Sequence, residues 1–261
     1  MARVIVTGAG IGGLTTALLL GRDGHEVTVL ERDPAPPPAS ADAAWAGWER
    51  RGVNQFRLLH FFLARFRAIL EAELPEVVDA LESAGALRLN FLRMVPDAVS
   101  GGYREGDDAY ELLAGRRPVM EAAMARVADA SAGVRIERGT AVAGLLTGRP
   151  VDGVPRVVGV RTETGTDLAA DLVVDTTGRR SPLPSWLEAI GAPAPMEERE
   201  DSGFVYYGRH FRSTDGTLPP SFGPNLQHYE SISFLTLPAD NGTWGVGIVT
   251  SAGRLQLNPP S

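Results

Sequence analysis

Apolar runs and glycines follow one another over residues 3–32 in the order expected of a strand, a turn, a helix and a second strand. Residues 4–6 are a β-branched run, which is typical of a parallel strand buried on both faces. An apolar helical segment that includes residues 15–21 and a second strand over residues 25–30 come next. The pattern predicts a βαβ unit, so the expected fold class is α/β with a Rossmann-like sheet.

The rest of the chain divides into a mixed part and a strand-rich part. Residues 33–38 (DPAPPP) must form a loop, because proline interrupts strands and helices. Beyond residue 191, apolar segments separated by loops rich in proline and glycine indicate an antiparallel sheet. The expected helices are a turn within 39–48 and segments 58–74, 75–85 and 118–130, and the expected strands are 86–95, 110–113, 134–137, 140–146, 156–162, 167–175, 204–212, 231–237 and 243–250.

The amino-acid composition argues against some classes of partner and site. The 261 residues are 44% hydrophobic and 22% charged, as in soluble globular proteins. Thirty-two acidic and twenty-five basic residues give a net charge of −7, which argues against a nucleic-acid partner. The chain contains no cysteine, so disulfides, thiol catalysis and thiolate metal sites are excluded.

The sequence shows neither a metal-binding motif nor a membrane-spanning segment. The histidines, at positions 25, 60, 210 and 228, show no metal-ligand spacing, so no metal is expected. No apolar run is long enough to span a bilayer, and glycines interrupt the N-terminal apolar stretch before it could serve as a signal peptide. We therefore expect a cytoplasmic protein.

Three glycines between the first strand and the helix form the sequence G-x-G-x-x-G. In such a turn the first glycine permits the bend, the second lets a diphosphate approach the backbone, and the third lets the helix pack on the sheet. Free N–H groups and the helix dipole would hold the diphosphate without a basic side chain. The predicted contact surface is the whole turn, Gly8, Ala9, Gly10, Ile11, Gly12 and Gly13.

Glu31 ends the second strand. A carboxylate at this position can accept hydrogen bonds from both ribose hydroxyls and repels a 2′-phosphate, so FAD or NAD is expected in preference to NADP. An ordinary glycine-rich turn is the alternative. The strand, helix, second strand and terminal acid together supply the context that the dinucleotide motif requires.

Four segments resemble the FAD-dependent monooxygenases that are related to aromatic hydroxylases, and the first is the turn at 8–13 with Glu31 and Arg32. The resemblance implies a Rossmann-like FAD-binding domain of the glutathione-reductase βαβ type with an inserted, largely antiparallel β-sheet substrate domain. It places the FAD-binding domain at residues 1–85 and 110–190, and the incomplete substrate-side sheet at 86–109 and 191–261.

Two further segments supply arginines. Residues 50–56 (RRGVNQF) are similar to the loop with which this family places an arginine beside the flavin diphosphate, and Arg51 is the better candidate. Arg117, followed by apolar residues three and seven positions on, resembles the family's next arginine, with Arg116 as its close competitor. The alternative for each of these arginines is an ordinary surface charge.

The fourth segment, residues 171–181 (DLVVDTTGRRS), occupies the place of the family's second fingerprint. Thr177 stands where aromatic hydroxylases carry an aspartate. The form Asp-x-x-Gly-Arg-x-Ser is more similar to flavin-dependent halogenases and isoprenoid reductases, which stay open as alternatives. The resemblance also implies that Val142 and Gly178 contact the cofactor.

The resemblance implies an FAD-binding oxidoreductase of the monooxygenase, or hydroxylase, type. Its substrate would be a small organic molecule or secondary metabolite, with NAD(P)H as electron donor or a flavin reductase as partner. Family members continue past this length with a Gly-Asp segment at the flavin, so a C-terminally truncated form is expected. The alternatives are a non-catalytic fragment or pseudoenzyme, and an NAD-binding module without flavin.

No compact motif for a catalytic acid, base or nucleophile is visible, so no catalytic residue is assigned. Four polar or aromatic residues lie on the strand expected to face substrate: Tyr206, Tyr207, Arg209 and His210. Ordinary alternation between core and solvent explains them equally well.

Overall fold

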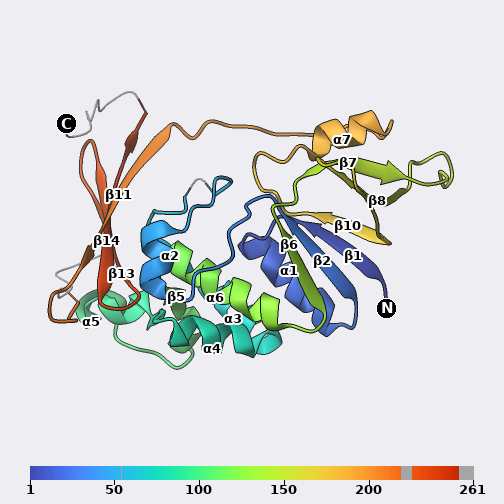
Figure 1. The fold of residues 1–261 in the computed structure, drawn as a ribbon. Coiled ribbons are helices and arrows are strands. Elements are labelled where there is room, and N and C mark those ends of the chain that lie inside the picture. Colours follow the sequence, from blue (N-terminus) through green and yellow to red (C-terminus); the bar gives the residue numbers. More distant parts are fainter. Residues whose placement is uncertain (54, 219–224, 253–261) are drawn as a thin grey trace. The chain divides into compact units, whose positions relative to one another are not determined.

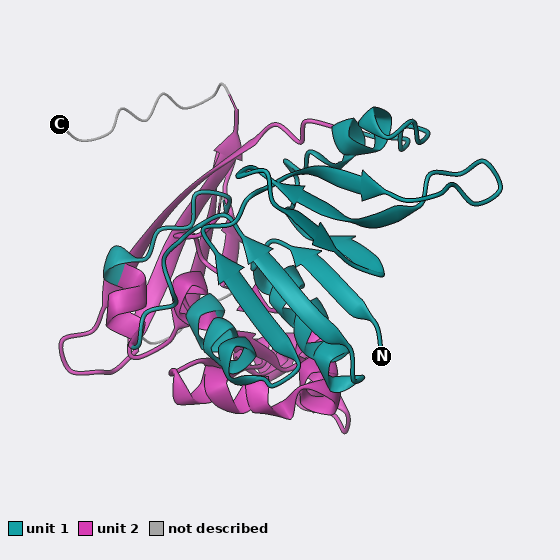
Figure 2. Cartoon of the chain, turned by 45° about the vertical axis from the view of Figure 1, so that its right-hand side comes forward, with its two compact units in different colours: residues 1–39, 46–54, 121–198 teal, residues 40–45, 55–120, 199–261 magenta. Residues whose placement is uncertain are grey.

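The structure, a computed structural model, describes residues 1–53, 55–218 and 225–252 (Figure 1). The chain divides into two compact units, which Figure 2 shows in different colours. Unit 1 comprises Met1–Ala39, Ala46–Asn54 and Glu121–Glu198, and unit 2 comprises Ser40–Trp45, Gln55–Met120 and Arg199–Ser261. The chain therefore passes from one unit to the other several times.

A four-stranded parallel sheet forms the centre of unit 1 (Figure 1). Helix α1 (Ile11–Arg22) connects its first two strands and buries Leu14, Ala17 and Leu18. The residues of the first strand from Val4 to Val6 are at most 3% exposed, which confirms the predicted βαβ unit with a strand buried on both faces. The sheet order is β10-β1-β2-β6, with β1 (Arg3–Thr7), β2 (Glu26–Glu31), β6 (Val134–Arg138) and β10 (Leu172–Asp175).

Unit 1 also contains a three-stranded antiparallel sheet. Its order is β7-β8-β9, with β7 (Val142–Thr147), β8 (Val157–Thr162) and β9 (Asp167–Ala169), and helix α7 (Leu183–Ala189) follows β10. The two sheets share one core, in which Ile5 and Leu30 of the parallel sheet pack with Val160 and Ala170. This apolar contact fixes the small sheet to the parallel sheet.

Unit 2 begins with short helices around a small antiparallel sheet of order β3-β5-β4. Helix α4 starts with proline in its first turn, as the sequence predicts, because that position needs no N–H donor. The strands of this sheet are β3 (Phe61–Phe62), β4 (Leu87–Leu89) and β5 (Leu112–Ala114). The helices are α2 (Ala41–Gly47), α3 (Ala64–Glu73), α4 (Pro75–Ser83), α5 (Asp97–Ser100) and α6 (Arg117–Ala130), and there are two 3-10 turns, Phe91–Met94 and Asp107–Tyr110. Helix α2 ends in unit 1, and most of α6 lies in unit 1.

The second sheet of unit 2 is the predicted antiparallel one. Its order is β11-β14-β13-β12, with β11 (Phe204–Arg212), β12 (Leu226–His228), β13 (Ser233–Ala239) and β14 (Thr243–Ser251). One face is rich in glycine because leucines lie close against it. A Cβ on Gly245 would lie 2.5 Å from Leu59 Cγ, and a Cβ on Gly208 would lie 2.9 Å from Leu58 Cδ2.

The structure corrects the predicted helix over residues 58–74. Strand β3 interrupts it, because Phe61 and Phe62 pair with residues of β5, and helix α3 begins only at Ala64. The backbone at Leu63 is extended, with φ −59° and ψ 154°. Apolar residues at three- and four-residue spacing predicted a helix here, but pairing with a distant strand overrides the local pattern.

The predicted strand over residues 86–95 is also shorter than expected. Only β4 is a strand, and Asn90 ends it by accepting a hydrogen bond at 3.0 Å from Leu92 N through its side chain. This local bond starts the first 3-10 turn, since asparagine side chains compete with strand pairing.

The compact units and the predicted domains do not coincide. Residues 40–45, 55–85 and 110–120, predicted to belong to the FAD-binding domain, lie in unit 2, and residues 191–198 of the predicted substrate-side sheet lie in unit 1. Residues 219–224 and 253–261 of that predicted sheet lie outside the described residues. The predicted domain boundaries stay a prediction.

Two features are absent from the part of the chain that the structure describes. None of its helices combines the length and the apolar character needed to cross a bilayer. Nor do histidine and acidic side chains of residues 1–53, 55–218 and 225–252 gather into a group that could hold a metal ion.

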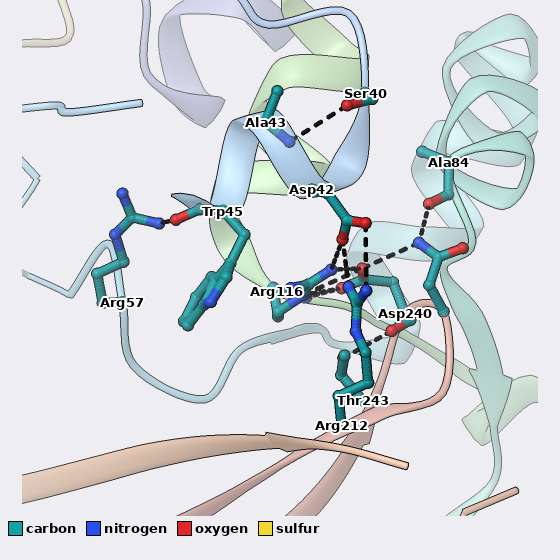
Figure 3. A network of polar contacts seen from close by, with 11 residues as sticks. Ser40, Asp42, Ala43, Trp45, Arg57, Ala84, Arg116, Arg212, Asp240 and Thr243 are labelled. Carbon is teal, nitrogen blue, oxygen red and sulfur yellow. Dashed lines mark hydrogen bonds and ion pairs between the residues drawn. The ribbon is translucent and has the colours of Figure 1, made fainter. Parts of the chain in front are cut away.

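A buried ion pair joins the two sheets of unit 2 (Figure 3). Arg116, just after β5, is 2% exposed, and Asp240, in the turn between β13 and β14, is fully buried. The Arg116 guanidinium donates from Nη2 to Asp240 Oδ2 at 2.6 Å, and its backbone N–H donates to Oδ1 at 2.7 Å. Arg116 also lies over the Trp45 ring, 5.1 Å from its centroid. The carboxylate is therefore held by both the side chain and the backbone of one residue.

We predict that Arg116→Met lowers the free energy of unfolding by about 3–5 kcal/mol, because Asp240 would keep a buried, unpaired charge. Arg93→Met is the matched control, since Arg93 pairs with Asp108 at a site where both side chains are more than half exposed. We expect that control to lower the free energy of unfolding far less, because solvent screens ion pairs between exposed side chains. The measurement is a denaturant titration of the full chain, and an equal loss of unfolding free energy in the two variants would contradict this account.

Two histidines of unit 2 are held in the neutral form. Burial, aided by the charge of Arg117, lowers the pKa of His60 from 6.5 to about 4. Burial and the charge of Arg116 lower the pKa of His210 to about 4, against the opposing effect of Asp240. A folded-state pKa below the unfolded value means that the unfolded chain binds more protons. Stability should therefore fall as the pH drops from 6.5 towards 4.

We predict that the double variant His60→Gln/His210→Gln loses less stability than the natural chain between pH 6.5 and pH 4.5. The measurement is the free energy of unfolding at each pH, in a range where most carboxylates remain ionised. A natural chain whose stability is flat over this range, or identical slopes in the two proteins, would show that these histidines are not buried as neutral groups.

Candidate functional site

The turn between β1 and α1 is held in shape by two of its glycines. Gly8 has φ +98°, and a Cβ there would lie 3.0 Å from the Thr176 carbonyl oxygen. A Cβ on Gly13 would lie 1.9 Å from Gly8 O and 2.6 Å from Thr176 Oγ1. No Cβ fits at 1.9 Å, so packing requires the third glycine of the motif, and the positive φ of Gly8 makes any side chain strained at the first.

The other two glycines of the turn face open space. A Cβ on Gly10 or on Gly12 would have no heavy atom of its surroundings within 4 Å. Gly10 is the N-cap of α1, in an extended conformation and without a side-chain cap. The first-turn N–H groups have no partners within the helix, so this end of α1 can receive an anion at close range.

Glu31, at the end of β2, lies beside this turn and is 6% exposed. Its Oε2 accepts hydrogen bonds from Ala9 N at 2.8 Å and from Arg50 Nη2 at 2.6 Å. Its Oε1 accepts from Asp33 N at 2.9 Å. The carboxylate thus has a fixed orientation at the place where the sequence predicts the ribose.

Arg50 is the centre of a buried charge cluster in unit 1. Besides Glu31, its guanidinium donates to Asp33 Oδ2 at 3.2 Å, to Ala9 O at 3.1 Å and to Glu121 Oε2 at 3.3 Å. Arg50 is 7% exposed and Glu121 is fully buried. The neighbouring pair of arginines in the sequence was the only signal for this cluster, and the carboxylates that surround Arg50 were not predicted.

The loop after β10 is tied to the same turn. Thr176 Oγ1 lies 2.7 Å from Thr7 O and 2.9 Å from Gly8 O, and it can donate to either. Asp175 accepts hydrogen bonds from Thr7 Oγ1 at 3.0 Å, from Thr177 Oγ1 at 2.7 Å and from Ser181 Oγ. Burial acts to raise the pKa of Asp175, but these hydrogen bonds outweigh it and hold the pKa below its usual value.

The remaining predicted residues lie on several different elements. Arg51 and Arg32 are exposed, and Gly178 is an exposed glycine with φ +82°. Val142 packs against the shared core of the two unit 1 sheets. Arg117 is half-buried at the start of α6, in unit 2. Contacts of these five residues with a cofactor therefore stay predictions.

Unit 2 has a hollow of its own. Its volume is about 800 Å³, within the range of small-molecule pockets. Phe61 and Phe91 meet edge to face at its wall, with ring centroids 5.6 Å apart. The other residues lining it include Leu63, Tyr103, Arg104 and Tyr110. Tyr206 and Tyr207 on β11 are exposed and are not among the lining residues, whereas His210 packs against Trp45 with ring centroids 4.6 Å apart.

Comparison with known proteins shows what this chain is similar to. Residues 3–97 match the family described as FAD dependent oxidoreductase. Protein Rv3254 of Mycobacterium tuberculosis is 29% identical over 98% of this chain, and the match covers 54% of that protein. The chain therefore spans about half the length of this relative.

Several solved structures have a similar fold. PqsL, a probable FAD-dependent monooxygenase from Pseudomonas aeruginosa, matches with a TM-score of 0.65 at 17% identity, over 96% of this chain and 60% of PqsL. Its complex with 2-aminobenzoylacetate matches with a TM-score of 0.66 at 15% identity, over 96% of this chain and 61% of that one. The tetrameric form of 2-methyl-3-hydroxypyridine-5-carboxylic acid oxygenase matches with a TM-score of 0.62 at 17% identity, over 97% of this chain and 59% of the oxygenase.

The chain thus matches the FAD-dependent oxidoreductases over residues 3–97 and has the fold of FAD-dependent monooxygenases, which confirms the resemblance predicted from its sequence.

Proposed function

We propose that this chain binds FAD and acts as a monooxygenase of the hydroxylase type on a small organic molecule. The observation that carries the proposal is the open space over Gly10 and Gly12 at the N-terminus of α1, next to the oriented carboxylate of Glu31. A diphosphate needs open backbone N–H groups, and a ribose needs an acceptor at the end of β2. The residues present therefore fit the cofactor.

The first-turn amides of α1 would hold the FAD diphosphate, and Glu31 would accept from the adenosine ribose. A 2′-phosphate is disfavoured there, because Glu31, Asp33 and Glu121 surround the guanidinium of Arg50. Like charges at such short range oppose the binding of a further anion. FAD or NAD is therefore expected to bind in preference to NADP.

FAD, when bound, supplies the oxygen chemistry: one oxygen atom of O₂ enters the substrate, the other leaves as water, and two electrons come from a donor. We propose NAD(P)H as that donor, either directly or through a flavin reductase. The residues of this chain bind and orient the reactants. PqsL, which has this fold, is described as a probable FAD-dependent monooxygenase, and another structure of PqsL is a complex with the small molecule 2-aminobenzoylacetate. A further structure with this fold is described as an oxygenase.

The aromatic hollow of unit 2 is proposed to receive the substrate. Phenylalanine and tyrosine rings line it, which favours a planar apolar molecule. A second candidate function, that of a flavin-dependent halogenase or isoprenoid reductase, is favoured by the sequence from Asp175 to Ser181, where Thr177 replaces the aspartate of aromatic hydroxylases. Identifying the product formed from a bound substrate distinguishes these reactions.

We predict that Gly10→Val weakens FAD binding by about two to four orders of magnitude, because a side chain would displace the diphosphate from two backbone donors. Its melting temperature should stay close to that of the natural chain, since beyond the adjoining chain no heavy atom lies within 4 Å of the new Cβ. Flavin fluorescence titration and thermal unfolding measure the two effects.

Two controls separate the roles of the glycines. Gly13→Ala should destabilise the fold itself, because of the 1.9 Å approach to Gly8 O. Gly144→Ala, on β7 and also with open space around its Cβ, should change neither property. Unchanged FAD affinity in Gly10→Val would reject the assignment of this turn.

We also predict that Phe91→Ala weakens binding of a fluorescent aromatic probe, 2-aminobenzoate, by about five- to thirtyfold, in line with roughly 1–2 kcal/mol for a lost aromatic contact. Phe204→Ala is the control, because Phe204 is 59% exposed on β11 and does not line the hollow. Equal affinity in both variants would show that the hollow does not bind aromatic molecules.

A further inference from the structure

The carboxylate of Glu31 has little free capacity for hydrogen bonds. A carboxylate offers about four acceptor positions, two on each oxygen. Ala9 N and Arg50 Nη2 occupy both positions of Oε2, at 2.8 and 2.6 Å. Asp33 N occupies one position of Oε1, at 2.9 Å. One acceptor position, on Oε1, therefore remains.

Arg50 is not free to move away and release a second position. Besides the contact with Glu31, its guanidinium donates from Nε to Asp33 Oδ2 and from Nη1 to Ala9 O and Glu121 Oε2. Arg50 is 7% exposed, and the side chain of Glu121 is fully buried. Withdrawing the guanidinium would leave three carboxylates in a poorly solvated site without their shared cation, which is strongly unfavourable.

We propose that Arg50 is a positioning residue of the nucleotide site, which restricts Glu31 to a single hydroxyl of the adenosine ribose. This inference rests on the proposed function, and it narrows the expectation from the sequence that Glu31 accepts from both hydroxyls. The restriction follows from the occupied Oε2, because the second hydroxyl finds no acceptor there. The second hydroxyl therefore contributes little to affinity at this site.

The ribose itself provides the test. Displacement of FAD from the full chain is measured with ADP, 2′-deoxy-ADP and 3′-deoxy-ADP. One of the two deoxy analogues should bind about ten- to a hundredfold more weakly than ADP, because it lacks the hydroxyl that donates to a charged acceptor. The other should bind within about threefold of ADP.

Equal weakening of both deoxy analogues would overturn the inference, and so would equal affinity of all three nucleotides. Failure of the proposed function gives a different result from failure of this inference. If neither FAD nor ADP binds at all, the proposed function fails, and the inference fails with it.

Two variants test the part played by Arg50. In Arg50→Lys the cation is kept, but a single ammonium group cannot bridge Glu31, Asp33 and Glu121 as a guanidinium does. With an Oε2 position released, the ratio of the two deoxy-analogue affinities should fall towards one. Glu121→Gln is the control, because it keeps the contact between Arg50 and Glu31 and should preserve the ratio. A role in stability alone would lower the melting temperature of both variants without moving this ratio in either, and that result would overturn the proposal.

Discussion

The structure of unit 1 depends on one close approach of backbone to backbone, between Gly8 and Gly13. A single added carbon on Gly13 would lie 1.9 Å from the Gly8 carbonyl oxygen. This packing sets the start of α1 against the ends of β1 and β10, with Thr176 bonded to the carbonyls of Thr7 and Gly8. Gly8 and Gly13 pack against each other on the inner side of the turn, whereas Gly10 and Gly12 have open space beside them.

Buried arginines organise the polar interior of each unit. In unit 1, Arg50 gathers three carboxylates at the end of the parallel sheet, and in unit 2, Arg116 holds Asp240 at the turn of the antiparallel sheet. Each of these arginines precedes a second arginine in the chain, which is exposed at position 51 and half-buried at position 117. A buried guanidinium with several partners serves to fix loops, so the first arginine of each pair is committed to structure.

Much of the fold could be predicted from the sequence, because the signals are local. The β-branched run of β1, the glycine turn, α1 and the long strands β11 and β14 each follow from patterns within about ten residues. Strand β3 could not, since pairing with the distant strand β5 decides it. The short extent of β4 was also missed, because the side-chain hydrogen bond of Asn90 to Leu92 N ends that strand. Of the site, the turn and Glu31 were predictable from their motif. The role of Arg50 was not, because Glu31 and Glu121 lie 19 and 71 residues away in the chain.

Amide hydrogen exchange of the full chain, with and without saturating FAD, tests the central claim most directly. The account predicts slower exchange at residues 8–13 and 31–33 when FAD is bound, because the first-turn amides of α1 would donate to the diphosphate and Glu31 would be covered by the ribose. Exchange in these segments that is unchanged by FAD, while flavin fluorescence shows saturation, would contradict it.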